Sequence, residues 1–386
     1  MVWKREDLNE QYYKRKRMMT MMMMMILVMS LGQLLYTCQA HKPLMASALY
    51  VFGDSLLDSG NNNLLPTLAK ANYEPYGFNF KDGFIVGPTG RYTNGRTVAD
   101  FIAEYLELPY APPYLSIRGS AALTGLNYAS GSCGILPETG SQYGECLNLN
   151  DQIDLFQTTI DTELKRKFNK SQDDDLSEYL SKSIFIFSIG NNDYINNYLN
   201  DSNYKCATKW KNYSPQTFAQ LLVNSLAQQS ERLYRLGARK VIVFELGPIG
   251  CIPSITRKSK EQGTKCVEEI NEMVRMFNQR LGVMLRNLTS SLQGSNFVLG
   301  RVHSLGYDAI KNPSKYGLVD TSSACCEAWF NGTSGCIPLL QPCKQISSHY
   351  FWDAFHVTET LCSVIANRCF TDSSFCSPTI KELVQI

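Results

Sequence analysis

The sequence lacks an excess of charge of either sign. Charged residues make up 19% of its 386 positions, and the formal net charge is +2. Residues 1–40 hold six basic and three acidic side chains, so the rest of the chain carries 31 basic and 32 acidic residues, a net charge of −1. Because phosphate backbones are bound by concentrated cationic surfaces, this balance argues against nucleic acid as the main partner. The hydrophobic content of 44% instead predicts a globular protein with a sizeable core.

Residues 41–386 also lack a proline-rich linker, a low-complexity tract and an internal repeat. These absences predict a single domain over 41–386, in which no stretch is long and apolar enough to span a membrane. Residues 1–40 differ, because the basic run Lys14–Arg17 precedes an apolar run that begins at Met18 and is followed by the small Ala40. This order is typical of a secretory signal peptide cleaved near Ala40, with an uncleaved signal anchor as the alternative.

Cysteine is plentiful, with 13 residues, and its number indicates the compartment. Cys38 would leave with the signal peptide, and an even set of 12 would remain. An even set of cysteines and five Asn-x-Ser/Thr sequons predict a secreted, extracellular glycoprotein with disulfide bonds. The sequon asparagines are Asn169, Asn200, Asn212, Asn287 and Asn331.

Some cysteine pairs can be predicted from their separation along the chain. Cys133 with Cys146, and Cys251 with Cys266, would close short loops at a low cost in entropy. Because neighbouring cysteines rarely bridge each other, Cys325 and Cys326 should take different partners, while the partner of Cys206 stays open. The candidate partners of Cys325 and Cys326 are Cys336, Cys343, Cys362, Cys369 and Cys376. A metal site made of Cys325, Cys326, Cys336, Cys343 and His349 is a weaker alternative, because adjacent cysteines lack metal-finger spacing.

Short apolar runs alternate with helical patterns. The predicted strands are 48–52, 126–129, 184–189, 241–244 and 297–299. The clearest helix begins after the N-cap Ser214, with Pro215 at its first position, and ends at Gly237; a second helix covers about 267–292. Strands that alternate with helices predict an α/β fold in which a parallel sheet is covered on both faces.

The polar residues that could do chemistry follow the first predicted strand. Ser55 lies in the turn Gly53-Asp54-Ser55, at the carboxyl end of a strand, where functional groups of parallel sheets gather. A nucleophilic serine needs a base, and the base needs an orienting acid. Of the four histidines, only His356 has an aspartate, Asp353, three positions before it. Each signal alone has an ordinary explanation as a turn or a cap, but together they predict a serine hydrolase.

Two further strand ends offer hydrogen-bond donors for an oxyanion. The loop 127–134 is rich in small residues whose backbone N–H groups can approach a ligand, and the loop 188–194 carries asparagine amides. The pentapeptide G-x-S-x-G is missing, which disfavours the nucleophile elbow of α/β-hydrolases.

As a set, these segments resemble the GDSL esterase/lipase family, the plant-type branch of the SGNH hydrolases, over about residues 47–368. The matching pieces are Val51–Leu56 with Asp58–Asn62, Asn94–Thr97, Asn127–Gly134, Gly190–Tyr194, Gly247–Cys251, Ala324–Cys326 and Asp353–His356. The resemblance implies a three-layer α/β/α sandwich with a mostly parallel, flavodoxin-like sheet. It also implies hydrolysis of carboxylic esters, of lipids or of acylated carbohydrates and small molecules, with no cofactor and no metal.

The resemblance assigns roles to individual residues. Ser55 would be the nucleophile, His356 the general base and then acid, and Asp353 the group that orients His356. The N–H groups of Ser55 and Gly131 with the amide of Asn192 would form the oxyanion hole.

The chain departs from the family pattern at two positions. Val357 stands where proline is usual and is expected to loosen the start of the last helix and shift His356. Ser132 stands where a second glycine is common, so the donor N–H belongs to Gly131 or to Ser132. Two other functions stay open: an acyltransferase with the same residues, and a catalytically weak secreted glycoprotein that binds carbohydrate or lipid.

Overall fold

The computed structural model describes residues 12–27, 29, 45–116, 123–168, 173–199, 209–210, 212–259 and 265–386. The chain divides into two units, Met1–Leu44 and Met45–Ile386. In the first unit, residues 12–27 form a helix whose side chains are exposed. In the described parts of the chain, no helix has the length and apolar character needed to cross a membrane. The expected cleavage site at Ala40 lies outside the described residues.

The second unit is built on a sheet of four parallel strands in the order β1-β4-β5-β6. The strands are β1 (Leu49–Gly53), β4 (Ile184–Ser188), β5 (Lys240–Phe244) and β6 (Asn296–Gly300). Every residue of β1, β4 and β5 is buried, which explains why their sequences are continuous apolar runs rather than alternating ones. Four of the five predicted strands are thus confirmed.

The prediction of a strand at 126–129 is wrong in extent. This segment forms two isolated parallel bridges, from Asn127 to Val51 of β1 and from Asn127 to Pro113. Tyr128 N–H donates to the Val51 carbonyl at 2.8 Å, but Asn127 N–H turns to Pro112 on its other side, at 2.9 Å. The segment therefore lies between β1 and residues 112–114 and is bonded to both, without forming a regular strand.

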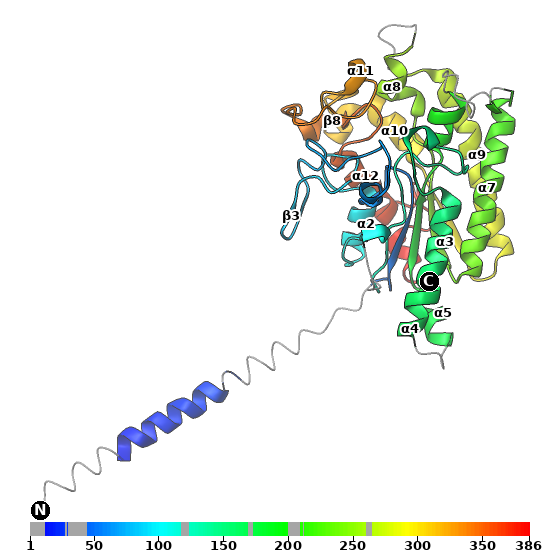
Figure 1. Cartoon of the computed structure of the whole chain (residues 1–386). Helices are drawn as coiled ribbons and strands as arrows, with labels where there is room; N and C mark the ends of the chain where they lie inside the picture. The colour runs from blue at the N-terminus through cyan, green and yellow to red at the C-terminus, as the bar shows by residue number, and fades with distance from the viewer. Residues whose placement is uncertain are drawn as a thin grey trace, which may run out of the picture. The chain divides into compact units, whose positions relative to one another are not determined.

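Helices cover both faces of this sheet (Figure 1). One face carries α3 (Leu149–Thr159), α7 (Pro215–Arg235) and α9 (Glu268–Ser291). The opposite face carries α2 (Val98–Tyr105), α10 (Val302–Lys311), α12 (Glu359–Thr371) and α13 (Ile380–Leu383). Side chains alternate accordingly, because Tyr50 and Phe52 pack with the first layer, whereas Val51 packs with the second. The three-layer α/β/α sandwich is confirmed.

The remaining elements are short. Two strands form a hairpin, β2 (Lys81–Asp82) and β3 (Ile85–Val86), and two more form a small parallel pair, β7 (Asp320–Ala324) and β8 (His349–Phe351). The short helices are α4 (Lys165–Lys167), α5 (Asp173–Ser181), α8 (Pro253–Thr256) and α11 (Trp329–Gly332). Single turns of 3₁₀ or π type, η1 to η8, are Asn61–Leu64, Tyr114–Ser116, Ser141–Tyr143, Ile160–Leu164, Asp193–Tyr198, Ile249–Cys251, Pro313–Tyr316 and Ile346–Ser348.

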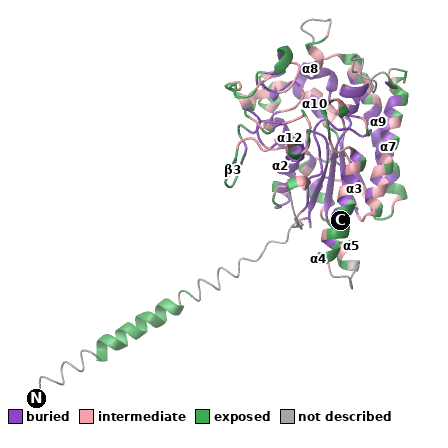
Figure 2. Ribbon diagram, viewed as in Figure 1, coloured by how far each residue is buried: buried purple, intermediate pink, exposed green. Residues whose placement is uncertain are grey.

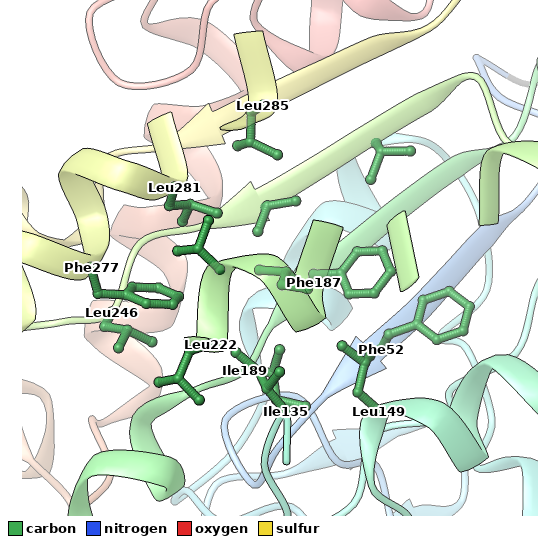
Figure 3. Packing of buried hydrophobic residues seen from close by; sticks show 14 of the residues in the cluster. Phe52, Ile135, Leu149, Phe187, Ile189, Leu222, Leu246, Phe277, Leu281 and Leu285 are labelled. Carbon is green, nitrogen blue, oxygen red and sulfur yellow. The ribbon is translucent and has the colours of Figure 1, made fainter. Parts of the chain in front are cut away.

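The largest core cluster lies between the sheet and α3, α7 and α9. Figure 2 shows the strands buried and the outer faces of α7 and α9 exposed. Figure 3 shows Phe52 and Phe187 of the sheet with Leu222 of α7 and Phe277 of α9 in this cluster. The predicted start of α7 is confirmed, because the Ser214 side chain accepts the Thr217 N–H and Pro215 takes the first position.

Five disulfides join described cysteines. They are Cys133–Cys146, Cys251–Cys266, Cys325–Cys343, Cys326–Cys336 and Cys369–Cys376. Both short predicted pairs are confirmed, and Cys325 and Cys326 have different partners. Cys362, one of the candidate partners, is buried and free, and Cys206 lies outside the described residues. The alternative metal site would use Cys325, Cys326, Cys336 and Cys343, and all four form disulfides. These cysteines therefore offer no thiolate ligands to a metal.

Candidate active site

Ser55 lies in a tight turn at the carboxyl end of β1. Gly53 allows this turn to pass close to β4, since a Cβ at Gly53 would lie 2.4 Å from the Ser188 carbonyl oxygen. Asp54 N–H donates to the same carbonyl at 3.0 Å, and the Asp54 carboxylate accepts the Leu56 N–H at 3.0 Å. The turn leaves Ser55 9% exposed, at the wall of a cavity.

His356 and Asp353 come from the loop between β8 and α12, about 300 positions further along the chain. His356 Nε2 lies 2.7 Å from Ser55 Oγ. On the other side of the ring, His356 Nδ1 lies 2.8 Å from Asp353 Oδ2 and 2.9 Å from Asp353 Oδ1. The three residues that the sequence singles out are therefore brought together in one hydrogen-bonded chain.

Asp353 is completely buried, yet its surroundings favour the charged form. Burial raises the pKa of this carboxyl, but the neighbouring His356 and hydrogen bonds from His356, Tyr76 and the Phe355 N–H outweigh burial and hold the pKa below its ordinary value. Tyr76 donates its hydroxyl to Asp353 Oδ2 at 2.6 Å. Burial and the adjacent Asp353 raise the pKa of Tyr76 well above its ordinary value, so this hydroxyl keeps its proton.

Val357 does not displace His356, which corrects the expectation drawn from the missing proline. The Val357 carbonyl accepts the Thr93 hydroxyl at 2.9 Å, and the His356 carbonyl accepts the Trp352 N–H at 2.8 Å. The first turn of α12 is also tied down, since the Glu359 N–H donates to the Asn94 side chain at 2.8 Å. These bonds hold the backbone on both sides of His356 without a proline.

The structure separates the two candidate backbone donors at the 127–134 loop. Gly131 N–H donates to Asp58 Oδ2 at 3.1 Å and to Asn62 Oδ1 at 3.0 Å, so it is engaged within the protein. Ser132 lines the cavity, with a φ of +68° that explains why glycine suits this position.

The amide of Asn192 lines the same cavity. Its Nδ2 donates one hydrogen to the Cys133 carbonyl at 3.0 Å, which fixes the amide orientation and leaves the second hydrogen for a ligand. Asn191 also lines the cavity, but its Nδ2 faces Asp54 Oδ2 at 3.4 Å.

Several supporting residues escape sequence reasoning. Asp58 accepts N–H groups of Gly60 and Asn61 at 2.7 Å, and burial raises the pKa of its carboxyl to about 6. Tyr92 lies against the His356 ring, with centroids 5.1 Å apart. Asp58 belongs to a segment that matches the family pattern, but nothing near Tyr76 or Tyr92 in the sequence connects them with His356.

One cavity of about 370 Å³ joins these groups. It is lined by Ser55, His356, Asn192 and Ser132 together with many apolar side chains. An enclosed apolar space with a few convergent polar groups is the usual form of a small-molecule site.

Comparisons with known proteins give the family. The model of GDSL-like lipases and acylhydrolases matches residues 49–369. The chain belongs to this family. It is similar to GDSL esterase/lipase 7 of Arabidopsis thaliana, with 49% identity over 86% of this chain and 90% of that protein. GDSL esterase/lipase At1g33811 of the same plant is 38% identical over 93% of this chain and 98% of that protein.

A solved structure of a gut microbial diltiazem-metabolizing enzyme aligns with a TM-score of 0.32 at 12% identity, over 78% of this chain and 45% of that one. The family assignment rests on the sequence matches. As a GDSL-type esterase/lipase, the chain is an ester hydrolase. The cavity beside Ser55 is the natural place to look for its active site.

Proposed function

We propose that this GDSL-type enzyme hydrolyses carboxylic esters through a covalent acyl-enzyme on Ser55, with His356 as base and acid and Asp353 as its orienting partner. The observation that carries the proposal is the continuous chain from Ser55 Oγ through the His356 ring to Asp353, with 2.7 Å and 2.8 Å between the atoms. A nucleophile, a base and an orienter at hydrogen-bond distance are the pattern of activated serine hydrolases.

The first half of the reaction transfers the acyl group. Ser55 Oγ attacks the ester carbonyl carbon while its proton moves to His356 Nε2, and the carbonyl oxygen becomes an oxyanion. Asp353 stabilises the imidazolium through Nδ1. When the tetrahedral intermediate collapses, the alcohol leaves with the proton from Nε2, and the acyl group stays on Ser55 as an ester.

The second half repeats these steps with water. His356 Nε2 takes a proton from water as the hydroxide attacks the acyl-enzyme, and the same proton returns to Ser55 Oγ when the acid leaves. The oxyanion of both steps would accept N–H groups of Ser55 and Ser132 and the free amide hydrogen of Asn192. We assign the second backbone donor to Ser132 because the Gly131 N–H is engaged by Asp58 and Asn62.

We also propose that the enzyme is secreted as the single domain 41–386 after loss of residues 1–40. The five disulfides fit an oxidising compartment. Asn212, Asn287 and Asn331 are exposed and accessible to glycosylation, whereas Asn169 and Asn200 lie outside the described residues.

The test is ester hydrolysis by the secreted protein combined with labelling by a fluorophosphonate. The parent should hydrolyse p-nitrophenyl acetate or butyrate and should be labelled at Ser55. Ser55→Ala should remain folded and lose both properties. Ser334→Ala is the matched control, since Ser334 lines the same cavity without contacting His356, and it should keep both. Labelling of another serine in an active parent would contradict the proposal.

A further inference from the structure

Tyr92 and Phe355 both place an aromatic ring next to His356. The centroid of the Tyr92 ring lies 5.1 Å from that of the imidazole, and the two planes are inclined by 37°. The Phe355 ring is farther away, at 6.1 Å, and its plane is inclined by 62°. Since an inclination of 37° is nearer to parallel than to perpendicular, the imidazole lies against the π system of Tyr92.

The hydroxyl of Tyr92 forms its hydrogen bonds away from His356. It donates to the Ala69 carbonyl at 2.6 Å and accepts a hydrogen from Asn62 Nδ2 at 3.2 Å. It also passes close to Gly131, where a Cβ would lie 2.3 Å from the hydroxyl oxygen. What Tyr92 presents to His356 is therefore its ring, and the hydroxyl anchors that ring.

The backbone beside Tyr92 is tied to the backbone beside His356. Thr93, the next residue, donates its hydroxyl to the carbonyl of Val357 at 2.9 Å. Tyr92 is only 6% exposed, and the side chain of His356 is 12% exposed. The two rings are thus fixed against each other at a place that little water reaches.

This contact matters because His356 gains a positive charge in the proposed reaction. It becomes an imidazolium each time it takes a proton from Ser55 or from water. A cation within about 6 Å of an aromatic centroid is attracted by the negative face of the ring, most strongly where water is excluded. Asp353 acts on the imidazolium in its plane, at Nδ1, whereas Tyr92 acts on its face. The neutral imidazole gains much less from the ring, so the contact favours the form that develops in the transition state.

We propose, on the basis of the function proposed above, that Tyr92 is a positioning residue that acts through His356: its π system stabilises the imidazolium, and its hydroxyl serves to fix the ring. This role needs an uncharged ring. Burial raises the pKa of Tyr92 well above its ordinary value, so the phenol keeps its proton. If Tyr92 merely held the loop in place, its hydroxyl would matter and the electron density of its ring would not.

Other charged and titratable groups surround His356 and line the cavity, and the test must leave them unchanged. They are Asp353, Asp54, Tyr73, Tyr76, Lys70 and Glu245. Burial raises the pKa of Asp54 to about 6, so this carboxyl titrates in the same range as a histidine. Proteins that differ only in the fluorine content of one ring share all of these groups, and a difference between their pH profiles reports the ring itself.

The experiment replaces Tyr92 by phenylalanine and by phenylalanines with one, two or three fluorines, incorporated by stop-codon suppression. Fluorine withdraws electron density from the face of the ring and changes its shape little. Tyr92→Phe should keep kcat within about threefold, although its unfolding temperature should fall because two hydrogen bonds are lost. Each fluorine should then lower kcat further, to a total of about tenfold, and move the acid limb of kcat/KM to lower pH, by up to about one unit.

The matched control places the trifluorinated phenylalanine at Phe355. Because the Phe355 ring lies 6.1 Å from the imidazole and is inclined by 62°, kcat should stay within about twofold and the acid limb should not move. Equal unfolding temperatures within the fluorinated series at Tyr92 show that the fold is unchanged. If Tyr92→Phe fails to fold, 3-fluorotyrosine and 3,5-difluorotyrosine at the same position keep the hydroxyl and carry the same test.

A loss of kcat in Tyr92→Phe that fluorine does not deepen would overturn the proposal, because it would assign the effect to the hydroxyl. An equal response to fluorine at Phe355 would overturn it too. Fluorophosphonate labelling separates these results from a failure of the catalytic proposal. A parent labelled at Ser55 whose activity ignores fluorine at Tyr92 refutes the role of Tyr92 alone, whereas an active parent that is not labelled at Ser55 contradicts the catalytic proposal itself.

Discussion

The two halves of the candidate active site are held in place by different means. Around Ser55, buried side chains bind the backbone: Gln152 bonds both the N–H and the carbonyl of Gly53 at 2.8 Å, and Asp58 accepts the N–H groups that follow it. Around His356, the loop is paired with the end of β7, where Cys325 and Cys326 donate their N–H groups to Phe351 and Trp352. Each of these cysteines is also part of a disulfide.

This difference follows from the place of each half in the fold. Ser55 follows β1, a strand of the main sheet whose residues are all buried, so a fully satisfied hydrogen-bond network is enough to fix its turn. His356 follows β8, which forms a two-stranded sheet with the short β7, apart from the main sheet. Short strands with little buried surface gain stability from covalent links. The comparison predicts that the two halves act as one unit in catalysis but respond differently to structural damage.

The largest expected effect is loss of the base. His356→Ala should lower kcat by about 10⁶-fold, as removal of a nucleophile or base does in serine hydrolases. The double variant Ser55→Ala/His356→Ala should be no slower than either single variant, because the two groups act in the same step. Steady-state hydrolysis of a chromogenic ester measures this, and additive losses in the double variant would show that the halves act independently.

Asp353→Asn should lower kcat by about 10⁴-fold with little change in KM, since the amide no longer stabilises the imidazolium. Tyr76→Phe, which removes one hydrogen bond to the same carboxylate, should lower kcat by no more than about tenfold. Because the pKa of Asp353 lies below its ordinary value, the carboxylate stays charged at pH 5 and should contribute no acid step to the pH profile above pH 4. An acid step above pH 4 that is present in the parent and lost in Asp353→Asn would contradict this assignment.

Asn192→Ala should lower kcat by about 10²–10³-fold through the loss of one oxyanion donor. Asn191 is next to Asn192 in the sequence and also lines the cavity, but its amide faces Asp54. Asn191→Ala should therefore lower kcat much less. Both are measured with the same ester under saturating conditions. A larger loss of kcat in Asn191→Ala than in Asn192→Ala would show that Asn192 is not the oxyanion donor.

Removal of the Cys326–Cys336 disulfide tests the structural difference between the two halves. Cys326→Ser/Cys336→Ser should lower the free energy of unfolding by about 2–3 kcal/mol and also reduce kcat, because the linked segment pairs with Trp352 beside Asp353. Cys369→Ser/Cys376→Ser at the end of α12 is the control. This control variant should be less stable, but at temperatures where it is still folded its kcat should equal that of the parent. Equal losses of kcat in the two disulfide variants would contradict the account.

The smallest effect is expected at Ser132. Ser132→Gly keeps the backbone N–H and relieves a φ of +68°, so kcat should stay within about threefold and the free energy of unfolding should change by less than about 1 kcal/mol. Gly131→Ala should be worse for stability, because its Cβ would lie 2.3 Å from the Tyr92 hydroxyl. Thermal unfolding and ester hydrolysis of the two variants compare the positions directly.

Much of the fold follows from local patterns in the sequence. The strands β1, β4 and β5 are recognisable because all their residues are buried and their sequences are therefore mostly apolar, and β6 is recognisable by its short apolar centre. The segment 126–129 carries the same pattern, but its backbone bonds are divided between β1 and residues 112–114 and form only isolated bridges. Such contacts cannot be read from its own residues.

The candidate site shows the same limit. Ser55, Asp353 and His356 are marked by their order and spacing, whereas the choice between Gly131 and Ser132 depends on Asp58 and Asn62, which lie about 70 residues away. Tyr76 reaches Asp353 across 277 positions, and Cys362 stays free because Cys369 bonds to Cys376. These outcomes are set by tertiary contacts rather than by local sequence.

The most direct test of the account is capture of the acyl-enzyme. The secreted protein is mixed with p-nitrophenyl butyrate, quenched in acid within milliseconds, digested and analysed by mass spectrometry. The account predicts a butyryl group on the peptide that contains Ser55, absent from Ser55→Ala and accumulating together with a burst of p-nitrophenol. A butyryl group on another residue, or hydrolysis that proceeds in Ser55→Ala, would contradict it.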